Sequence, residues 1–461
     1  MPYAPPPTEM PRCPGPSMQD LLKAEGEVVP EVLREESYVD YGDSPIAIER
    51  YTSRAFHDRE VEQMWRKVWQ MVGRVEQIPH VGDHLVYDIA DDSLLVTRTT
   101  ETEIKAFYNA CLHRGTRLRD EGGCVPAFRC PFHGFTWGLD GTLKGVPCRW
   151  DFPTLKDEDF RLPEACVATW GGFVFINMDP HCMPLEEYLG DVGHHFDAWP
   201  LEKRYLAAHV SKIVHGNWKV AQEAFMEAYH VPDTHPQFDG VMGDWNGQYD
   251  VYPGGHSRVY HSSYTPSPRM ILTGTHGLSA QAVADTSALF LGLKGPLEVP
   301  AGKTARQALA QKYRRVLETK TGADLSGYTT TEMVDQLSYF FFPNFFPWAG
   351  FGSPLLYRFR PNGNDPDSCI MVVMLMAPQP ENGPCPSPAQ HRRLGPEEAW
   401  ADAVELGGGR AAVFDQDTAN IPRIQAGLKT TRKAGISPSH YQEVRIQHMH
   451  HVLDQYLGAA G

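Results

Sequence analysis

Apolar side chains recur at helical spacing in two stretches of the chain. Residues 58–71 place such side chains three and four positions apart, which predicts an amphipathic helix. This helix would bury Val61, Met64, Trp65, Val68 and Trp69. A second helix is predicted over residues 304–320, because Thr304 and Gln307 suit a capping box and Gly322 follows the pattern.

Short runs of β-branched and aromatic residues, separated by turn residues, dominate two other parts of the chain. Residues 70–180 contain many such runs, with turns such as Asp140-Gly141, and they predict a small β-rich domain. Three further runs predict strands, and residues 362–365 predict a hairpin turn between two of them. These runs are residues 339–342, 355–359 and 370–376.

Residues 217–230 lack proline and glycine and are rich in helix-forming residues, so they predict a third helix. Asn217 is a suitable N-cap, and Val231-Pro232 is expected to end the helix. The spacing i, i+4 and i+7 then places three polar residues on one helix face. They are Glu223, Glu227 and His230, and His235 follows from the next loop.

The pattern divides the chain into three parts. Residues 1–17 hold seven prolines and few apolar anchors, so we expect residues 1–45 to form an N-terminal tail that is partly disordered. Residues 46–180 are expected to form the β-rich domain. Residues 181–461 are expected to form a larger domain of helices and an antiparallel sheet.

Composition narrows the classes of function. The chain has 461 residues, of which 42% are hydrophobic and 21% charged, as in an ordinary soluble globular protein. The net charge of −15 argues against binding to nucleic acid or to anionic membranes. The longest apolar run, residues 369–378, is too short to span a bilayer, and no signal peptide is recognised. We therefore expect a cytoplasmic protein whose cysteines outside the motifs below are free thiols.

Two short motifs each combine one cysteine with one histidine. They read Cys111-x-His113 and, sixteen residues later, Cys130-x-x-His133. A Rieske two-iron, two-sulfur cluster takes two thiolates on one iron and two imidazoles on the other. A zinc site is the alternative, although zinc fingers usually pair cysteine with cysteine and histidine with histidine along the chain. The mixed motifs favour the iron–sulfur cluster.

His230 and His235 are suited to bind a second metal ion. Two histidines and one distant carboxylate make a facial triad for iron, which leaves positions open for dioxygen. A lone histidine or glutamate on a helix is more often a solvated or core residue. The two cysteine–histidine motifs favour the metal-binding role here. A cluster that passes electrons and a site that activates oxygen together indicate an oxygenase.

With these motifs the chain resembles the catalytic (alpha) subunit of the Rieske non-heme iron oxygenases, the aromatic ring-hydroxylating family. The resemblance covers most of the chain, from about residue 51 to about residue 428. It rests on CLHRG (111–115), CPFHGFTW (130–137), WGGFVFINMD (170–179), NWKVAQEAFMEAYHVPDTHP (217–236) and FDQDTANIPRIQAGL (414–428). It implies an α+β fold, with the Rieske domain in 46–180 and a catalytic domain around a mononuclear iron in 181–461.

The resemblance also assigns residues and cofactors. It implies a [2Fe-2S] Rieske cluster on Cys111, His113, Cys130 and His133. It implies a mononuclear Fe(II) on His230, His235 and Asp417. Asp415 competes with Asp417 for the third place, and Asn217 is expected to line the iron site. Electrons would come from NAD(P)H through a separate reductase or ferredoxin.

Glu227 departs from the pattern of many ring-hydroxylating relatives, which have aspartate at this position. There the carboxylate bridges a cluster histidine of one subunit and an iron-ligand histidine of the next, in a head-to-tail trimer. Glutamate resembles the branch that oxidises quaternary amines such as carnitine or choline. The resemblance implies a homotrimer, with or without a β subunit, and no binding to nucleic acid or membrane.

Three functions therefore compete. The first is an oxygenase that hydroxylates an aromatic or other hydrophobic ring. The second is a monooxygenase that cleaves a C–N or O-alkyl bond. The third is an electron carrier or a zinc-stabilised binding protein, which gives His230, His235 and Asp417 no purpose.

Two surfaces complete the expectations. Aromatic and sulfur-containing side chains are candidates for a substrate pocket, although core packing is the commoner role. They are Phe225, Met226, Trp245, Phe340, Phe341, Phe342, Phe345 and Trp348.

Residues 111–150 carry a local excess of basic side chains, which predicts a docking surface for an acidic electron donor unless they brace the cluster loops. The basic residues are Arg114, Arg117, Arg119, Arg129, Lys144 and Arg149.

Overall fold

The computed structural model describes residues 3–8, 10, 12–274, 278–290, 293 and 297–458. The chain forms two compact units. One comprises Met1–His57, Leu189–Arg360 and Pro366–Gly461, and the other comprises Asp58–Tyr188 with Pro361–Asp365. Residues 46–57, which we expected in the β-rich domain, therefore belong to the larger unit.

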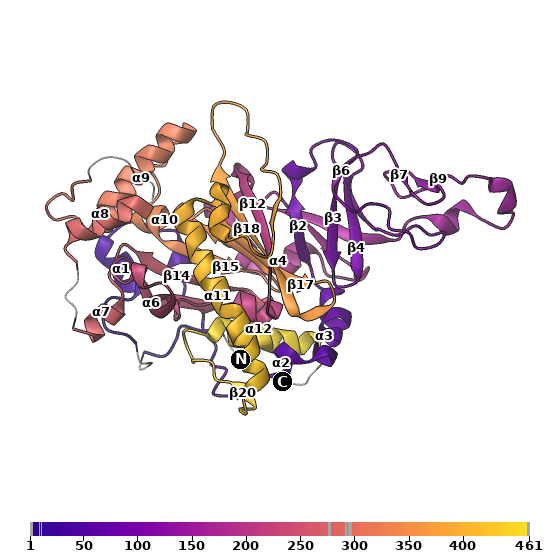
Figure 1. Cartoon of the computed structure of the whole chain (residues 1–461). Coiled ribbons are helices and arrows are strands. Elements are labelled where there is room, and N and C mark those ends of the chain that lie inside the picture. The colour runs from indigo at the N-terminus through magenta and orange to yellow at the C-terminus, as the bar shows by residue number, and fades with distance from the viewer. Residues whose placement is uncertain are drawn as a thin grey trace. The chain divides into compact units, whose positions relative to one another are not determined.

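The smaller unit is built from short antiparallel strands (Figure 1). Within its described residues, one sheet of seven strands has the order β2-β11-β10-β5-β4-β3-β6, and a three-stranded sheet has the order β7-β8-β9. The strands of the first sheet are β2 (Gln70–Arg74), β11 (Phe173–Asn177), β10 (Glu164–Trp170), β5 (Ile104–Tyr108), β4 (Asp92–Arg98), β3 (Asp83–Ile89) and β6 (Gly123–Cys124). Those of the second are β7 (Phe128–Arg129), β8 (Thr136–Trp137) and β9 (Leu143–Gly145). The prediction of a β-rich domain is confirmed.

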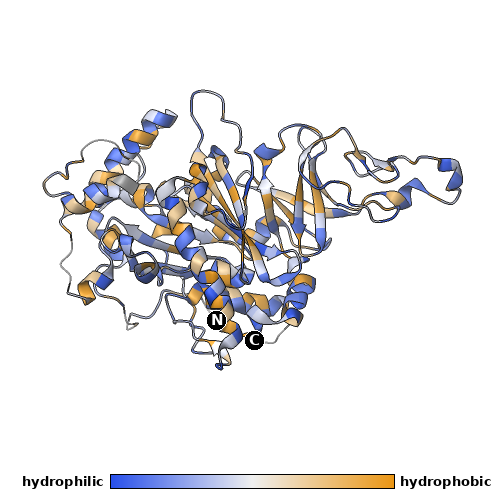
Figure 2. Ribbon diagram, in the orientation of Figure 1, coloured by the Kyte–Doolittle hydropathy of each residue, from blue (hydrophilic) through white to orange (hydrophobic). Residues whose placement is uncertain are grey.

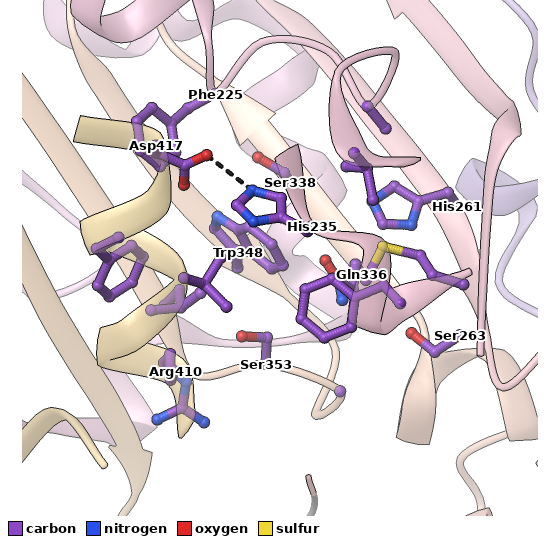
Figure 3. A pocket seen from close by; sticks show the side chains of 18 of the residues that line it. Phe225, His235, His261, Ser263, Gln336, Ser338, Trp348, Ser353, Arg410 and Asp417 are labelled. Atoms are coloured by element: carbon purple, nitrogen blue, oxygen red, sulfur yellow. Dashed lines mark hydrogen bonds and ion pairs between the residues drawn. The ribbon is translucent and has the colours of Figure 1, made fainter. Parts of the chain in front are cut away.

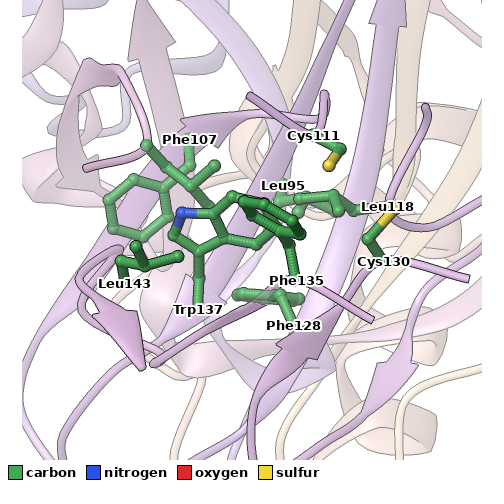
Figure 4. Close-up of a cluster of buried hydrophobic side chains, with 10 residues drawn as sticks. Leu95, Phe107, Cys111, Leu118, Phe128, Cys130, Phe135, Trp137 and Leu143 are labelled. Atoms are coloured by element: carbon green, nitrogen blue, oxygen red, sulfur yellow. The ribbon is translucent and has the colours of Figure 1, made fainter. Parts of the chain in front are cut away.

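A compact aromatic core fills this unit. Trp137, Phe128 and Phe107 are fully buried, and the indole N–H of Trp137 donates to the carbonyl of Phe160 at 2.7 Å. Figure 4 shows Cys111 and Cys130 at the edge of this cluster. The core therefore supports the backbone from which both cysteines project.

The helix predicted over residues 58–71 has different bounds. The structure has α3 (Arg54–Glu60), continued by a wider π-helical turn, η2 (Val61–Trp65). The helical spacing does not extend to residue 71, because β2 begins at Gln70 and pairs with β11. All five apolar residues of the pattern are nevertheless buried.

A mixed sheet forms the centre of the larger unit. The eight strands that the described residues contribute have the order β13-β14-β15-β16-β17-β18-β12-β19. They are β13 (Met242–Val251), β14 (Ser257–Ser263), β15 (Gln336–Phe340), β16 (Phe345–Ala349), β17 (Leu355–Asn362), β18 (Asp365–Pro378), β12 (Arg204–Val214) and β19 (Arg392–Leu394). Strands β13 to β17 pair antiparallel in chain order, whereas β12 runs parallel to β19. Figure 2 shows hydrophobic positions concentrated in the strands.

The strand predictions hold in outline. The runs at 355–359 and 370–376 lie inside β17 and β18, and the turn between these strands is Gly363-Asn364, as the predicted hairpin requires. The run at 339–342 is displaced, since β15 ends at Phe340.

Helices cover this sheet and connect its strands. The helix predicted at 304–320 is α9 (Ala305–Thr321), with the Thr304–Gln307 capping box and a left-handed Gly322 at its end. The longest is α11 (Gly408–Thr430), which packs against α5 and β12. The others are α1 (Met18–Glu25), α2 (Glu49–Thr52), α4 (Leu185–His194), α5 (Trp218–Glu223), α6 (Val231–Thr234), α7 (Pro268–Leu272), α8 (Ala280–Phe290), α10 (Thr330–Val334) and α12 (Val444–Tyr456). A two-stranded pair joins β1 (Ile46–Ala47) to β20 (Gly435–Ile436). An α+β fold is confirmed.

Much of the expected N-terminal tail is folded. Residues 1, 2, 9 and 11 lie outside the described residues, but α1 buries Met18 and Leu22. Arg258, fully buried, pairs with Asp250 at 2.6 Å and donates to the carbonyl of Val32 at 2.6 Å. Residues 18–45 therefore include folded segments that contact the rest of the larger unit.

Two negative expectations concern the whole chain. Every cysteine is a free thiol, as predicted for the seven outside the metal motifs. Among the described helices, none combines the length and apolar character that a membrane span requires.

Candidate metal centres and substrate cavity

Cys111 and Cys130 open two loops of the same backbone geometry. The N–H of Gly115 donates to the Cys111 carbonyl at 2.8 Å, and the N–H of Gly134 donates to the Cys130 carbonyl at 3.0 Å. Both glycines have φ +76°, a left-handed conformation that glycine adopts at no steric cost. The two motifs therefore share one tight turn from cysteine to glycine, although their histidines stand two and three residues after the cysteine.

The four side chains of the two motifs converge. The Cys111 and Cys130 thiols are close enough for each to shift the pKa of the other, and the rings of His113 and His133 are 4.8 Å apart. His113 stacks on Phe135 at 4.7 Å, and its buried Nδ1 has no hydrogen-bond partner among the described residues. A buried nitrogen that lacks a partner beside two thiols is suited to bind metal.

Backbone amides favour the thiolate form of Cys130. Burial raises its pKa, but the N–H groups of His133 and Phe132 and the thiol of Cys111 lower it below the ordinary value. The pKa of Cys111 stays raised, because burial outweighs the amides of its own loop. Such N–H groups donate to the sulfur of a cluster ligand and stabilise its negative charge.

The helix predicted at 217–230 forms only in its first half, and a separate short helix follows it. α5 ends at Glu223, and α6 begins at Val231, so Pro232 starts a helix instead of ending one. Between them, the Glu227 carboxylate accepts the backbone N–H groups of Tyr229 and His230, the latter at 3.0 Å. This local side-chain bonding replaces helical bonds, and the predicted shared face of Glu223, Glu227 and His230 does not exist.

His230, His235 and Asp417 come together from α11 and the two ends of α6. One possible ligand atom of each residue lies within 4.8 Å of the others. His235 Nε2 is 2.8 Å from Asp417 Oδ1, and His230 Nε2 is 3.4 Å from the same oxygen. His235 and Asp417 are only 2% and 6% exposed. Two imidazoles and a carboxylate so placed form a facial triad that fits one iron ion.

Each histidine is oriented through its other ring nitrogen. His230 Nδ1 lies 2.6 Å from Glu227 Oε1, and His235 Nδ1 lies 2.8 Å from Gln416 Oε1. Such partners fix the imidazole rotation and leave both Nε2 atoms free to bind a metal. Sequence reasoning missed Gln416, although it is adjacent to Asp417 in the motif that it singled out.

The structure separates the two candidate aspartates. Asp417 faces the histidines, whereas Asp415 accepts the backbone N–H groups of Trp400 and Ala401 at 2.7 and 3.0 Å. Asp415 therefore holds the preceding segment against α11, and its carboxylate is already satisfied by two donors.

Two carboxylates make the triad attractive to a cation. Burial alone lowers the pKa of His230, yet Glu227 and Asp417 raise it to about 10. Burial raises the pKa of Asp417, but His230 and His235 hold it below its ordinary value. A site with this excess of negative charge favours a bound positive ion.

Asn217 has a role different from the one implied by the resemblance. Its side chain accepts the N–H of Lys219 at 3.1 Å, as an N-cap of α5, and donates to the Pro366 carbonyl at 2.8 Å. The N-cap prediction is confirmed. Neither cavity described below is lined by Asn217, so its assignment to the iron site is not supported.

Glu223 is also separate from the triad. Its carboxylate lies 3.0 Å from the Tyr51 hydroxyl and 2.8 Å from His450 Nε2, and its side chain is 11% exposed. Burial raises its pKa from 4.5 to about 8, although Tyr51 and Lys219 oppose the shift. Burial therefore favours the protonated form of Glu223 in the folded chain.

This raised pKa gives a prediction for stability. Between pH 4.5 and about 8 the unfolded chain ionises Glu223 while the folded chain keeps its proton, so stability is lost as pH rises. Glu223→Gln should therefore gain relative to wild type by up to about 5 kcal/mol across this window. Melting temperatures measured every half pH step test this, and parallel curves for the two proteins would contradict it.

A cavity of about 630 Å³ opens beside the triad. Aromatic side chains form much of its wall: Phe225, Phe238, Tyr264, Tyr313, Trp348, Tyr357 and Phe414. Figure 3 shows Asp417 and His235 at one end of this cavity and Arg410 and Ser353 at the other. A smaller cavity of about 200 Å³ reaches Glu227, His230 and Asp417 together with Tyr51 and Glu223.

The predicted pocket residues divide into two groups. Phe225 and Trp348 line the larger cavity. The remaining candidates lie elsewhere: Met226, Trp245, Phe340, Phe341, Phe342 and Phe345. Sequence reasoning missed the polar lining residues His261, Ser263, Gln336, Ser338, Ser353 and Arg410, which carry no motif.

Comparison with known families places both units. Residues 191–459 match the model of the ring hydroxylating alpha subunit (catalytic domain). Residues 68–156 match the Rieske [2Fe-2S] domain. The chain belongs to the ring hydroxylating alpha subunit family. Members of this family with a Rieske domain carry a [2Fe-2S] cluster and a mononuclear iron, so both predicted cofactors are confirmed.

The relatives that match this chain are named either as dioxygenases or as monooxygenases. The chain is 31% identical over 198 residues to the biphenyl 2,3-dioxygenase subunit alpha of Rhodococcus jostii (strain RHA1), a match that covers 42% of this chain and 43% of the relative. It is 29% identical over 212 residues to the carnitine monooxygenase oxygenase subunit of Escherichia coli (strain K12), covering 43% and 57%. The chain thus spans about half the length of the curated relatives that it matches.

Solved structures show the same fold. The quaternary ammonium Rieske monooxygenase CntA in complex with L-carnitine superposes with a TM-score of 0.63 at 18% identity, covering 89% of this chain and 95% of that one. Naphthalene 1,2-dioxygenase from Rhodococcus sp. bound to indole gives 0.60 at 21% identity, covering 91% and 95%. The fold is therefore shared by both activity classes and does not choose between them.

Proposed function

We propose that the chain is the terminal oxygenase of a Rieske-type system, which uses O2 and electrons from NAD(P)H to hydroxylate an aromatic or other hydrophobic ring. The observation that carries this proposal is the opening of the His230–His235–Asp417 triad into an aromatic cavity of about 630 Å³. Such a cavity binds an apolar ring beside the triad and excludes water from it.

Each group of residues has a distinct task in this proposal. Cys111, Cys130 and the two motif histidines hold the cluster, and the triad holds the iron. When bound, the cluster supplies electrons and the iron activates dioxygen. Glu227 and Gln416 keep the two imidazoles in the orientation that binds metal.

Glu227 is proposed to connect neighbouring subunits as well. Its side chain is 8% exposed and already holds His230 Nδ1 at 2.6 Å. A carboxylate that also reached a cluster histidine of the next subunit would provide a route for electrons in a head-to-tail homotrimer. The trimer, and any β subunit, are part of the proposal.

The electron donor is proposed to be an acidic ferredoxin or a reductase. Arg117 and Arg149 are neutralised by Asp88 and Asp157, at 2.8 and 2.7 Å, so they brace the smaller unit. Arg114, Arg129 and Lys144 remain exposed, and Arg114 lies 5.5 Å over the Phe132 ring, which is also exposed. These three residues, here called the basic rim, provide the surface for docking.

Docking through the basic rim predicts a salt-sensitive reaction. Raising ionic strength from about 50 to about 500 mM should raise the KM for a reduced plant-type ferredoxin by about tenfold, because screening weakens attraction between opposite charges. Steady-state turnover at several donor concentrations measures this effect. A KM that stays constant over this range, in wild type and in Lys144→Gln alike, would show that the basic rim does not dock the electron donor.

A second function is favoured by the aromatic wall and by glutamate at position 227. Tyr357 packs against Phe225, Trp348 and Phe414 with ring separations of 4.9, 5.9 and 5.8 Å. Such a group of rings can also hold a quaternary ammonium by cation–π attraction. The alternative proposal is therefore a monooxygenase that cleaves a C–N or O-alkyl bond.

Single-turnover chemistry tests the proposal without a partner protein. The holoprotein, reduced with dithionite and freed of excess reductant, is mixed with ¹⁸O2 and a panel of ring compounds and quaternary amines. Ring products that contain ¹⁸O support the main proposal, and dealkylated products support the alternative. His235→Ala should form neither, and wild type without any labelled product would reject both.

A further inference from the structure

One positive charge faces the substrate cavity. Arg410, the second residue after Gly408 in α11, lines the cavity and is half-buried. Its Nη1 donates to the carbonyl of Leu406 at 3.1 Å, and no carboxylate pairs with its guanidinium among the described residues. Burial lowers the pKa of Arg410, although Tyr357 and Tyr313 oppose this. A desolvated guanidinium that lacks an anion leaves several N–H donors available.

Arg410 lies on the same helix face as Asp417. The two residues are seven positions apart on α11, which is about two turns and about 10 Å along the helix axis. Figure 3 shows the two side chains on the same helix, with Arg410 well below Asp417 in the view. A molecule whose reacting atom lies at the triad would therefore reach Arg410 with a group about 10 Å away.

The backbone around Arg410 adds to the positive potential. Gly407, Gly408 and Gly409 line the same end of the cavity, and α11 starts there without a side-chain cap. The first amides of a helix have no partners within the helix, and three glycines leave them uncovered by side chains. Gly408 and Gly409 have no other atoms within 4 Å of where a Cβ would lie, so the space beside this part of the backbone is open.

Other polar groups in the cavity also lack partners. Ser338 Oγ and His261 Nδ1 find no hydrogen-bond partner among the described residues, although these residues are only 4% and 7% exposed. Burial lowers the pKa of His261 to about 4, so the imidazole is neutral. Buried polar groups of this kind are usually satisfied, which indicates a ligand that is more polar than a plain hydrocarbon.

We propose that the substrate carries a carboxylate, and that Arg410 with the N-terminus of α11 binds it at the end of the cavity opposite the triad. This inference rests on the proposed function, and it narrows the substrate class to organic acids. Two sources share this chemistry: an aryl carboxylate, whose ring packs on the aromatic wall, and a zwitterionic betaine. A hydrocarbon or a plain cation leaves the guanidinium without its anion.

Binding, not turnover, provides the test. Titration calorimetry on the anaerobic holoprotein compares biphenyl-4-carboxylate with biphenyl-4-carboxamide, and γ-butyrobetaine with choline. In each pair only the first has the carboxylate. We expect at least one carboxylate to bind about 10- to 100-fold more tightly than its counterpart, as a charge-assisted contact allows. The tighter pair identifies the source of the carboxylate.

Variants connect the preference to Arg410. Arg410→Gln should remove the preference for the carboxylate and change the amide or choline affinity little, and Arg410→Lys should restore part of it. Arg423→Gln is the matched control, since Arg423 is exposed on the same helix and does not line the cavity. Circular dichroism and the melting temperature of each variant verify folding, because the cluster residues belong to the other compact unit.

The outcomes separate the two proposals. Equal binding within each pair, or a preference that survives in Arg410→Gln, would overturn the carboxylate inference and leave the oxygenase proposal intact. Arg410-dependent carboxylate binding without any ¹⁸O-labelled product would support the inference and reject the oxygenase proposal.

Discussion

Removing one triad ligand is expected to eliminate turnover and to leave the cluster in place. His230→Ala or Asp417→Ala should lower kcat/KM by more than about 100-fold. Changing a residue that only supports a metal ligand costs up to about 100-fold, and loss of a ligand itself should cost more. Iron should fall by about one per chain, while acid-labile sulfide stays constant, because the cluster residues belong to the other compact unit. Iron and sulfide analysis together with steady-state rates measures both effects.

Asp415 supplies the matched control for this experiment. It lies two residues from Asp417 on α11, but its carboxylate accepts the N–H groups of Trp400 and Ala401. Asp415→Asn should keep the iron and change turnover only a few-fold. If Asp415→Asn loses the iron and Asp417→Ala retains it, Asp415 and not Asp417 is the third iron ligand.

Glu227→Gln is expected to keep both metals and to slow electron transfer by about 10- to 100-fold, the range found for residues that support metal ligands. The amide has the size of the carboxylate but lacks its charge, so it holds His230 less firmly and no longer stabilises positive charge on that ring. Stopped-flow absorbance follows oxidation of the pre-reduced cluster when oxygen and substrate are added.

Glu227→Asp distinguishes the effect of the carboxylate charge from the effect of side-chain length. If a carboxylate is what matters, aspartate should recover part of the rate, because it keeps the charge and loses one methylene. A Glu227→Gln protein with the wild-type rate of cluster oxidation would rule out the bridging role.

Local chemistry made much of the molecule predictable from the sequence. The Thr304–Gln307 capping box and Gly322 fixed both ends of α9, because caps act on neighbouring backbone groups. The metal motifs were equally visible, since spacing along a tight loop determines which side chains converge. His113 and His133 lie on separate loops, and folding of the unit brings their rings to 4.8 Å from each other.

Non-local contacts decided what the sequence did not show. One local contact was also missed: residues 217–230 have good helix propensity throughout, but the Glu227 carboxylate accepts the amides of Tyr229 and His230, which lie beyond the end of α5 at Glu223. The choice between Asp417 and Asp415 depends on which face of α11 meets α6, and that is set by packing. Arg410 belongs to no motif, and Gln416 lies within the motif at 414–428 without being one of its expected ligands. Only the folded chain brings Arg410 to the cavity and Gln416 to the triad.

The metal content of the purified protein tests the central claim most directly. Iron, acid-labile sulfide and zinc per chain are measured together with an EPR spectrum after reduction. We expect about three irons and about two sulfides per chain, with the signal of a histidine-ligated [2Fe-2S] cluster. Zinc without labile sulfide would contradict the oxygenase account at both metal centres.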